Sequence, residues 1–348
     1  MDLMQSAEQD AIQQTVRSFL ENELPLARVR QMSQSGADGL EAIWRAAGEL
    51  GFFGLGLGEA LGGAGYSLTE EMILFEELGR TLAPGAWLGS VIAGHALEKR
   101  SGSTEAAARK RLLAGELRVA LVERAEREPL RIGSGRVSGE RHNVADAGGA
   151  GALLILDAAR ILFVPCDGTG VEIDPRPSLD PTRPVAHVKL RDAQCIDLGD
   201  GAEPLRRMAT VLACAEAVGG IQRTVEMSVE YGKVRQQFGK PIGSFQAVKH
   251  RSADMAVRAE VARSATIYAT VSVRDDAPDA DFQIAVAKLL CANAYLQNTA
   301  DNVQNHGGMG FTWECDAHLF VKRSRAFDST IGPRRAQMDA LVAQFRAA

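Results

Sequence analysis

Apolar residues near the N-terminus repeat at the spacing of an α-helix. Ile12 and Val16 share one helix face, and Ser6 with Gln9 has the spacing of a capping box, in which two side chains satisfy backbone N–H groups at a helix start. Further helical patterns follow for about a hundred residues. We therefore expect a helical domain over residues 1–116.

One predicted helix of this region is rich in carboxylates. The apolar spacing and the glycine that follows predict a helix over residues 68–78. That span contains four glutamates, Glu70, Glu71, Glu76 and Glu77. Because carboxylates are rarely buried, we expect these glutamates to form a solvated helix face.

The pattern changes near Leu117, where short β-prone runs replace helical spacing. The runs are separated by Gly, Pro and Asp clusters, as in Asp167-Gly168-Thr169-Gly170. They span residues 119–122, 152–156, 161–164 and 185–190. We expect a small antiparallel sheet or barrel over residues 117–202.

Long helical patterns return after this sheet region. They cover residues 205–229, 245–273 and 282–303, with short polar connections between them. We expect a four-helix bundle over residues 203–348. The predicted fold class is therefore mostly α with a β domain, in the order helical domain, small sheet or barrel domain, helical bundle.

Composition narrows the class of protein. The chain has 348 residues and a formal net charge of −5, which gives no basic excess for broad nucleic-acid binding. The cysteines are scattered, without a Cys-x-x-Cys pair, so we expect no metal site and a reducing cytoplasm. We also expect no signal peptide and no membrane-spanning helix.

Two motifs in the C-terminal region carry the chemistry. The first is Arg235-Gln236-Gln237-Phe238-Gly239, followed by Phe245-Gln246, and the second is Gln304-Asn305-His306-Gly307-Gly308. At this spacing they resemble the flavin-binding signatures of the acyl-CoA dehydrogenase family, and the three-part order resembles that family over nearly the whole chain. The resemblance implies an FAD-dependent enzyme that desaturates an acyl-CoA thioester between its α and β carbons.

The resemblance implies a role for each motif residue, and its chemistry suits that role. Arg235 offers a planar, always-charged fork for a pyrophosphate, and Phe238 offers an aromatic surface. Gln246 and Gln304 are polar partners for cofactor edges. Gly307 and Gly308 let the backbone approach a ligand closely. Each residue alone has an ordinary structural explanation, whereas the combination predicts FAD binding.

The catalytic base of the family is missing from its usual places. Most members have a glutamate where this chain has Ile331, and a minority have it where this chain has Ala209. Neither side chain accepts a proton, so the base is unknown. Glu216 is the first of the remaining candidates, with a structural carboxylate as the alternative. Glu203 and Asp328 also remain, and His306 is more often a packing or cofactor-edge residue than a base.

Intact cofactor motifs without a base resemble the shorter subunit of heteromeric bacterial acyl-CoA dehydrogenases. The leading hypothesis is an α2β2 enzyme with a full-length chain that supplies the glutamate, a bulky acyl-CoA as substrate, and an electron-transfer flavoprotein as acceptor. The alternatives are a self-sufficient homodimeric or homotetrameric dehydrogenase or oxidase with an unorthodox base, and a non-catalytic scaffold or acyl-CoA-binding subunit.

Overall fold

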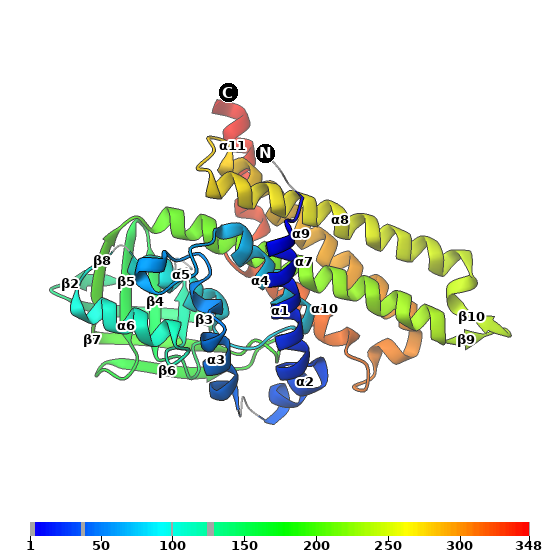
Figure 1. Cartoon of the computed structure of the whole chain (residues 1–348), viewed down its shortest axis with the longest axis horizontal. Helices are drawn as coiled ribbons and strands as arrows, with labels where there is room; N and C mark the ends of the chain where they lie inside the picture. Colours follow the sequence, from blue (N-terminus) through cyan, green and yellow to red (C-terminus); the bar gives the residue numbers. More distant parts are fainter. Residues whose placement is uncertain (1–3, 36–38, 99, 124–128, 348) are drawn as a thin grey trace. The chain divides into compact units, whose positions relative to one another are not determined.

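The chain forms two compact units, each built from segments that are distant in sequence. The computed structural model describes residues 4–35, 39–98, 100–123 and 129–347 (Figure 1). Unit 1 combines Met1–Gln31, Met72–Ala83 and Thr210–Ala348, and unit 2 combines Met32–Glu71 and Pro84–Ala209. The domain division expected from the sequence follows chain order instead, and it stays a prediction.

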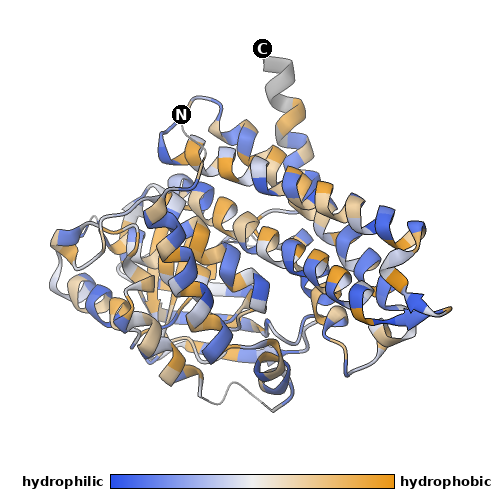
Figure 2. Cartoon of the chain, turned by 45° about the vertical axis from the view of Figure 1, so that its right-hand side comes forward, coloured by the Kyte–Doolittle hydropathy of each residue, from blue (hydrophilic) through white to orange (hydrophobic). Residues whose placement is uncertain are grey.

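Long helices dominate unit 1. Helices α7 (Ala202–Val234), α8 (Gln246–Arg274) and α9 (Ala280–His306) run beside one another (Figure 1), and hydrophobic and hydrophilic residues alternate along them (Figure 2). A buried hydrogen bond of 2.8 Å from Ser228 to Asn302 joins α7 to α9. The remaining elements of this unit are α1 (Ala7–Glu23), α10 (Ala317–Ser329), α11 (Arg334–Ala347), β9 (Gln236–Gln237), β10 (Lys240–Pro241), η3 (Ile242–Ser244) and η4 (Gly307–Phe311).

Helix α4 (Leu68–Thr81) corrects one sequence prediction. Its glutamates are buried rather than solvated, with exposed fractions between 1% and 8%. Each has a compensating partner: Glu77, for example, accepts from Arg17 on α1 at 2.7 Å. In unit 2, burial lowers the pKa of His95, but the Glu71 carboxylate 2.8 Å away outweighs burial and raises that pKa to about 9. The spacing of apolar residues along a helix does not show whether a carboxylate is buried with a partner of opposite charge. The prediction of a solvated face was wrong for this reason.

The start of α1 agrees with the sequence. Ser6 accepts from the backbone N–H of Gln9, and the Gln9 side chain accepts from the backbone N–H of Ser6. This reciprocal pair confirms the predicted capping box.

The helical part of unit 2 is held by an aromatic cluster. Trp44 lies 5.1 Å from Phe53 and 4.4 Å from Trp87 between ring centroids, and all three rings are buried. These rings belong to α3 (Leu40–Glu49), η1 (Phe52–Gly54) and α5 (Trp87–Glu98). The other helices of this region are η2 (Glu59–Leu61) and α6 (Ser103–Leu113), while α2 (Leu26–Ser35) begins in unit 1 and ends in unit 2.

Among the described residues, unit 2 also holds two four-stranded sheets. Their strand orders are β1-β4-β5-β8 and β2-β3-β7-β6. The strands are β1 (Val119–Val122), β2 (Arg131–Gly133), β3 (Arg136–Ala145), β4 (Ala152–Asp157), β5 (Arg160–Pro165), β6 (Val171–Arg176), β7 (Val185–Gln194) and β8 (Ile196–Asp200). The predicted runs are β1, β4, β5 and β7. The pairing is antiparallel as expected, except that β1 runs parallel to β4.

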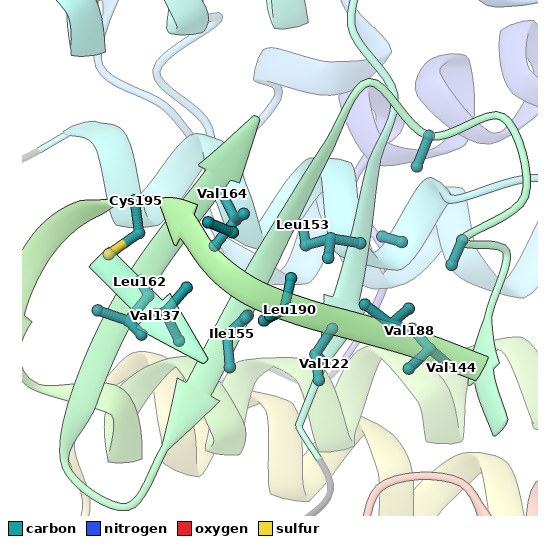
Figure 3. Packing of buried hydrophobic residues seen from close by; sticks show 14 of the residues in the cluster. Val122, Val137, Val144, Leu153, Ile155, Leu162, Val164, Val188, Leu190 and Cys195 are labelled. Atoms are coloured by element: carbon teal, nitrogen blue, oxygen red, sulfur yellow. The ribbon is translucent and has the colours of Figure 1, made fainter. Parts of the chain in front are cut away.

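One hydrophobic core lies between the two sheets (Figure 3). Leu153 and Ile155 of β4 and Val137 and Val188 of the other sheet are all at most 1% exposed. Figure 3 shows these side chains gathered between the strands that carry them. The mostly helical fold with a β region, predicted from the sequence, is thereby confirmed.

A β-bulge interrupts the pairing of β3 with β7. Arg141 pairs with Val188 and Val144 pairs with Ala186, so two residues of β3 face the single residue His187. The second of the two bulged residues has a left-handed backbone, with φ of 55°. Bulges of this kind redirect side chains at one point of a sheet.

Helices α4 and α7 cross at two glycines with their backbones in contact. A Cβ on Gly79 would lie 1.8 Å from the carbonyl oxygen of Glu216, and a Cβ on Gly219 would lie 1.8 Å from that of Glu76. No other residue fits at either position. The crossing fixes where Glu216 emerges from α7.

Candidate functional site

A two-residue hairpin connects α7 to α8 and carries the first sequence motif. Strands β9 and β10 pair through Gln237 and Lys240, and Phe238 and Gly239 form the turn between them. Both turn residues have positive φ, 54° and 75°. This is the geometry of a type I′ turn, which normally takes Asn or Gly at the first position.

Phe238 is therefore an unusual residue for its backbone. A bulky side chain in the left-handed region is strained, and such strain concentrates at functional sites. The ring is 90% exposed, and it contacts Phe245 edge-on at 6.0 Å between centroids. An exposed aromatic ring on a strained turn has no packing explanation within the described residues, which favours a binding role.

Arg235 and Gln246 flank this hairpin, and both are exposed. Arg235 ends α7, with its backbone N–H donating to Tyr231 at 2.9 Å, while its carbonyl oxygen accepts from Ile242 at 2.8 Å. That second bond closes the base of the hairpin. Gln246 is the first residue of α8. The hairpin thus presents a guanidinium, an aromatic ring and an amide from one short segment.

The second motif lies at the end of α9. Gln304 is exposed, and its carbonyl oxygen accepts from the backbone N–H of Gly307, which ends the helix with φ of 59°. A Cβ added at Gly307 or Gly308 would meet no atom within 4 Å. The loop therefore faces open space rather than a neighbouring element.

The structure brings both motifs to the same end of the helices in unit 1. The first turns of α8 meet the last turn of α9 through a 3.2 Å hydrogen bond from Arg251 to Asn305. Tyr231 near the end of α7 stacks on His306 at 4.3 Å between ring centroids. Figure 1 shows the hairpin and the end of α9 at this end of the long helices. Six sequence-predicted cofactor residues thus share one surface region.

A cleft of about 400 Å³ lies beside the hairpin, between the end of α7 and the start of α8. Its lining includes the apolar residues Val229, Pro241 and Val248 together with Lys233 and Lys249. Neither lysine was predicted from the sequence as a cofactor-binding residue. The sequence feature that could have identified them is their position close to Arg235, since these cations together give a locally basic segment in a chain of net negative charge.

These features fit an elongated, anionic, aromatic cofactor such as FAD. The exposed Arg235 and the two cleft lysines suit a pyrophosphate, since cations are the groups that bind phosphate oxygens. The exposed Phe238 ring suits stacking on an aromatic ring. The open backbone of Gly307 and Gly308 suits close approach of a ligand.

Glu216, the candidate base, is buried in an ion pair. Its Oε1 accepts from Nη1 of Arg323 at 2.5 Å, and the two residues are 8% and 2% exposed. Arg323 also donates to the carbonyl oxygen of Leu82 at 3.4 Å. Because the Glu216 carboxylate neutralises a buried guanidinium, moving it to another task would leave that positive charge buried and unpaired. This supports the interpretation of Glu216 as a structural carboxylate rather than a base.

The two positions that correspond to the family's bases are apolar and buried. Ala209 of α7 is fully buried, and Ile331, just beyond α10, is 5% exposed. Ile331 has φ of 50°, a strained conformation for a β-branched residue. His306 is 9% exposed and its Nδ1 lies 2.8 Å from the carbonyl oxygen of Asn302, as expected of a packing histidine.

Comparisons with known proteins agree with both motifs. Residues 6–115 match the family description "Acyl-CoA dehydrogenase, N-terminal domain", and residues 190–345 match "Acyl-CoA dehydrogenase, C-terminal domain". The chain belongs to the acyl-CoA dehydrogenase family. It is 33% identical over 320 residues to the acyl-CoA dehydrogenase IpdE2 of Mycobacterium tuberculosis, covering 91% of each chain. These matches identify an oxidoreductase that acts on acyl-CoA.

Solved structures of acyl-CoA dehydrogenases share this fold. A variant of the steroid ACAD Tcur3481-Tcur3483 superposes with a TM-score of 0.89 at 25% identity, covering 98% of this chain and 99% of that one. The ChsE4-ChsE5 complex from Mycobacterium tuberculosis gives 0.90 at 24% identity, covering both chains completely. Among the described residues, no helix is both long and apolar enough to cross a membrane.

Proposed function

We propose that this acyl-CoA dehydrogenase is an FAD-dependent enzyme that works as one subunit of a heteromer, with the catalytic glutamate supplied by a partner chain. The observation that carries the proposal is the combination of a surface whose residues suit FAD with apolar residues at both base positions, Ile331 and Ala209. The buried ion pair of Glu216 with Arg323 supports it, because it leaves this chain's candidate base engaged.

The cofactor residues have distinct tasks in this proposal. Arg235 neutralises the pyrophosphate, and Phe238 stacks against an aromatic part of the cofactor. Gln246 and Gln304 orient the cofactor through hydrogen bonds, and the backbone of Gly307 and Gly308 approaches it closely. When bound, FAD supplies the redox chemistry by accepting the hydride from the β-carbon of the acyl group.

The partner's contribution follows from what this chain lacks. Desaturation requires a base that removes the α-proton while the thioester carbonyl is polarised. With Ile331 in the base position, this chain has no group there that can accept the proton. A full-length acyl-CoA dehydrogenase chain carries a glutamate at that position. We propose an α2β2 assembly, which the two-component names of the steroid ACAD and ChsE4-ChsE5 structures support.

An exposed apolar stripe on α8 supports association with another chain. Val257, Val261 and Tyr268 are 63%, 47% and 38% exposed, and their spacing places them on one helix face. Large apolar side chains that are exposed along one helix face commonly belong to a protein interface. We assign this face to the assembly and a bulky acyl-CoA, such as a steroid side-chain thioester, to the substrate. An electron-transfer flavoprotein is the acceptor in this proposal.

The absorption spectrum of the purified protein tests the proposal. We expect flavin bands when the chain is co-expressed with a neighbouring acyl-CoA dehydrogenase gene product and co-purifies with it, and weak or absent bands in the chain alone. Full flavin content and turnover in the isolated chain would replace the heteromer by a homomeric enzyme. Absence of flavin from both samples would favour a non-catalytic scaffold.

A further inference from the structure

Three potential metal ligands meet on the second sheet of unit 2. Glu140 and His142 lie on β3, and His187 lies on β7. Their ligand atoms all lie within 4.8 Å of one another. The cluster could not be predicted from the sequence, because His187 lies 45 residues after His142 and meets Glu140 and His142 only through strand pairing.

The β-bulge creates this arrangement. Glu140 and His142 are two residues apart, so their side chains leave the same face of β3. The bulge at residues 142 and 143 sets His142 opposite His187 across the strand pair. The two imidazole rings stack at 4.0 Å between centroids and 19° between planes. The bulge therefore redirects the side chain of His142 so that its ring lies against that of His187.

His187 provides the independent sign of a ligand. It is 8% exposed, and its Nε2 has no hydrogen-bond partner among the described residues. Oε2 of Glu140 lies 3.0 Å from this nitrogen, but out of line for a hydrogen bond. A buried nitrogen without a hydrogen-bond partner is unfavourable unless a ligand satisfies it.

We propose that Glu140, His142 and His187 bind a divalent transition-metal ion of the zinc type. Two imidazoles and one carboxylate form a ligand set that zinc takes in proteins, whereas magnesium and calcium prefer all-oxygen sites. Because Glu140 and His142 are exposed, water completes the coordination. The ion satisfies Nε2 of His187 and links β3 to β7 at the bulge, where ladder hydrogen bonds are missing.

Neighbouring charges do not compete for this position. Asp174 of β6 pairs opposite His187 in the strand register, but its carboxylate is 2.6 Å from Arg176. Lys189, two residues after His187, lies 3.3 Å from Glu172. Both groups are thus neutralised by partners of their own, and the carboxylate of Glu140 is the charge that faces the two histidines.

A zinc titration of the full chain tests the proposal. The protein is first freed of metal with a chelator, and zinc is then added in the presence of a chromophoric zinc indicator that competes for it. We expect one tight zinc ion per chain and at least about tenfold weaker binding in His142→Ala, since even outer-shell changes weaken metal sites by that factor. Glu140→Gln should weaken binding similarly. His250→Ala, an exposed histidine on α8, is the matched control and should bind zinc like the parent.

Two results would overturn the assignment. One is the absence of stoichiometric zinc binding in the parent. The other is binding that is equally strong in His142→Ala, Glu140→Gln and the control, which would identify adventitious surface binding only. Because Glu140 and His142 are exposed, both variants should fold normally, and a circular dichroism melt of each variant checks this directly.

Discussion

The buried pair of Glu216 and Arg323 ties the stability of unit 1 to two opposite charges. Each side chain is nearly inaccessible to water, and each is the other's counter-charge. Removing one charge leaves the other buried and unpaired, which is strongly unfavourable. The residue that the sequence offers as a candidate base thus contributes to the stability of the fold.

Glu216→Gln should therefore lower the free energy of unfolding by about 3 kcal/mol. Urea denaturation followed by circular dichroism measures this change. Replacing both residues together, as Glu216→Leu with Arg323→Met, should recover part of the loss, because no charge is then left unpaired. Unchanged stability with abolished turnover in Glu216→Gln would instead identify Glu216 as the base.

Glu76 makes stability depend on pH. Burial raises the pKa of Glu76 to about 7, although Arg263 lowers it in part. In the unfolded chain a glutamate titrates near 4.3. The folded protein therefore holds a proton more tightly, so the free energy of unfolding falls as pH rises from about 4.3 to 7 and is constant in this respect above 7.

The variant Glu76→Gln should abolish that fall. Relative to the parent, we expect its free energy of unfolding to rise by about 3 kcal/mol between pH 4.5 and pH 8. Chemical denaturation at both pH values measures the difference. Glu260→Gln, an exposed carboxylate on α8, is the control and should leave the parent's pH profile in place. An equal shift in both variants would contradict the assignment to Glu76.

At the scale of elements, the sequence predicted what local periodicity determines. Helices α8 and α9, the capping box of α1 and strands β1 and β4 all follow from apolar spacing and turn residues. Strand β3 was missed because charged and polar residues break its alternation, and its pairing with β7 lies far away in sequence. The glutamates of α4 were misassigned because their partners, such as Arg17, come from other segments.

The candidate site also has a part that the sequence predicted and a part that only the structure shows. Its motif residues were found because they occupy two short stretches of fixed spacing. That Phe238 adopts a strained left-handed turn, and that Lys233 and Lys249 line the adjoining cleft, required the backbone geometry. The ion pair of Glu216 with Arg323 also required it, since these residues meet only when α7 and α10 pack.

The crossing of α4 and α7 predicts a severe effect of one methyl group. Gly79→Ala should destabilise the protein by more than about 4 kcal/mol, because its Cβ would lie 1.8 Å from a backbone oxygen that cannot move without separating two helices. Expression level and thermal melting measure this. Gly148→Ala, where a Cβ meets nothing within 4 Å, is the matched control and should melt within a degree or two of the parent.

At the scale of the whole molecule, Arg235 tests the cofactor surface. Arg235→Ala should weaken FAD binding by about 10- to 100-fold in the assembled enzyme, since a charge-assisted hydrogen bond contributes about 1.5–3 kcal/mol. The melting temperature of the flavin-free chain should not change, because the side chain is exposed. Fluorescence titration of FAD into the flavin-free complex measures the affinity.

Arg274→Ala provides the comparison for that experiment. This arginine is exposed at the opposite end of α8 and pairs with Asp275 at 2.7 Å. It should leave FAD affinity at the parent value. A similar loss of affinity in both variants would show that net charge, rather than the position of Arg235 at the hairpin, governs binding.

The paired glycines at the helix crossing also restrict how the gene can vary. Any missense change in a glycine codon adds at least a Cβ, and at Gly79 and Gly219 that atom would fall inside a neighbouring carbonyl group. Both positions are consequently closed to amino-acid replacement. A survey of natural alleles should find synonymous changes at these two codons, whereas exposed turn glycines such as Gly148 accumulate replacements.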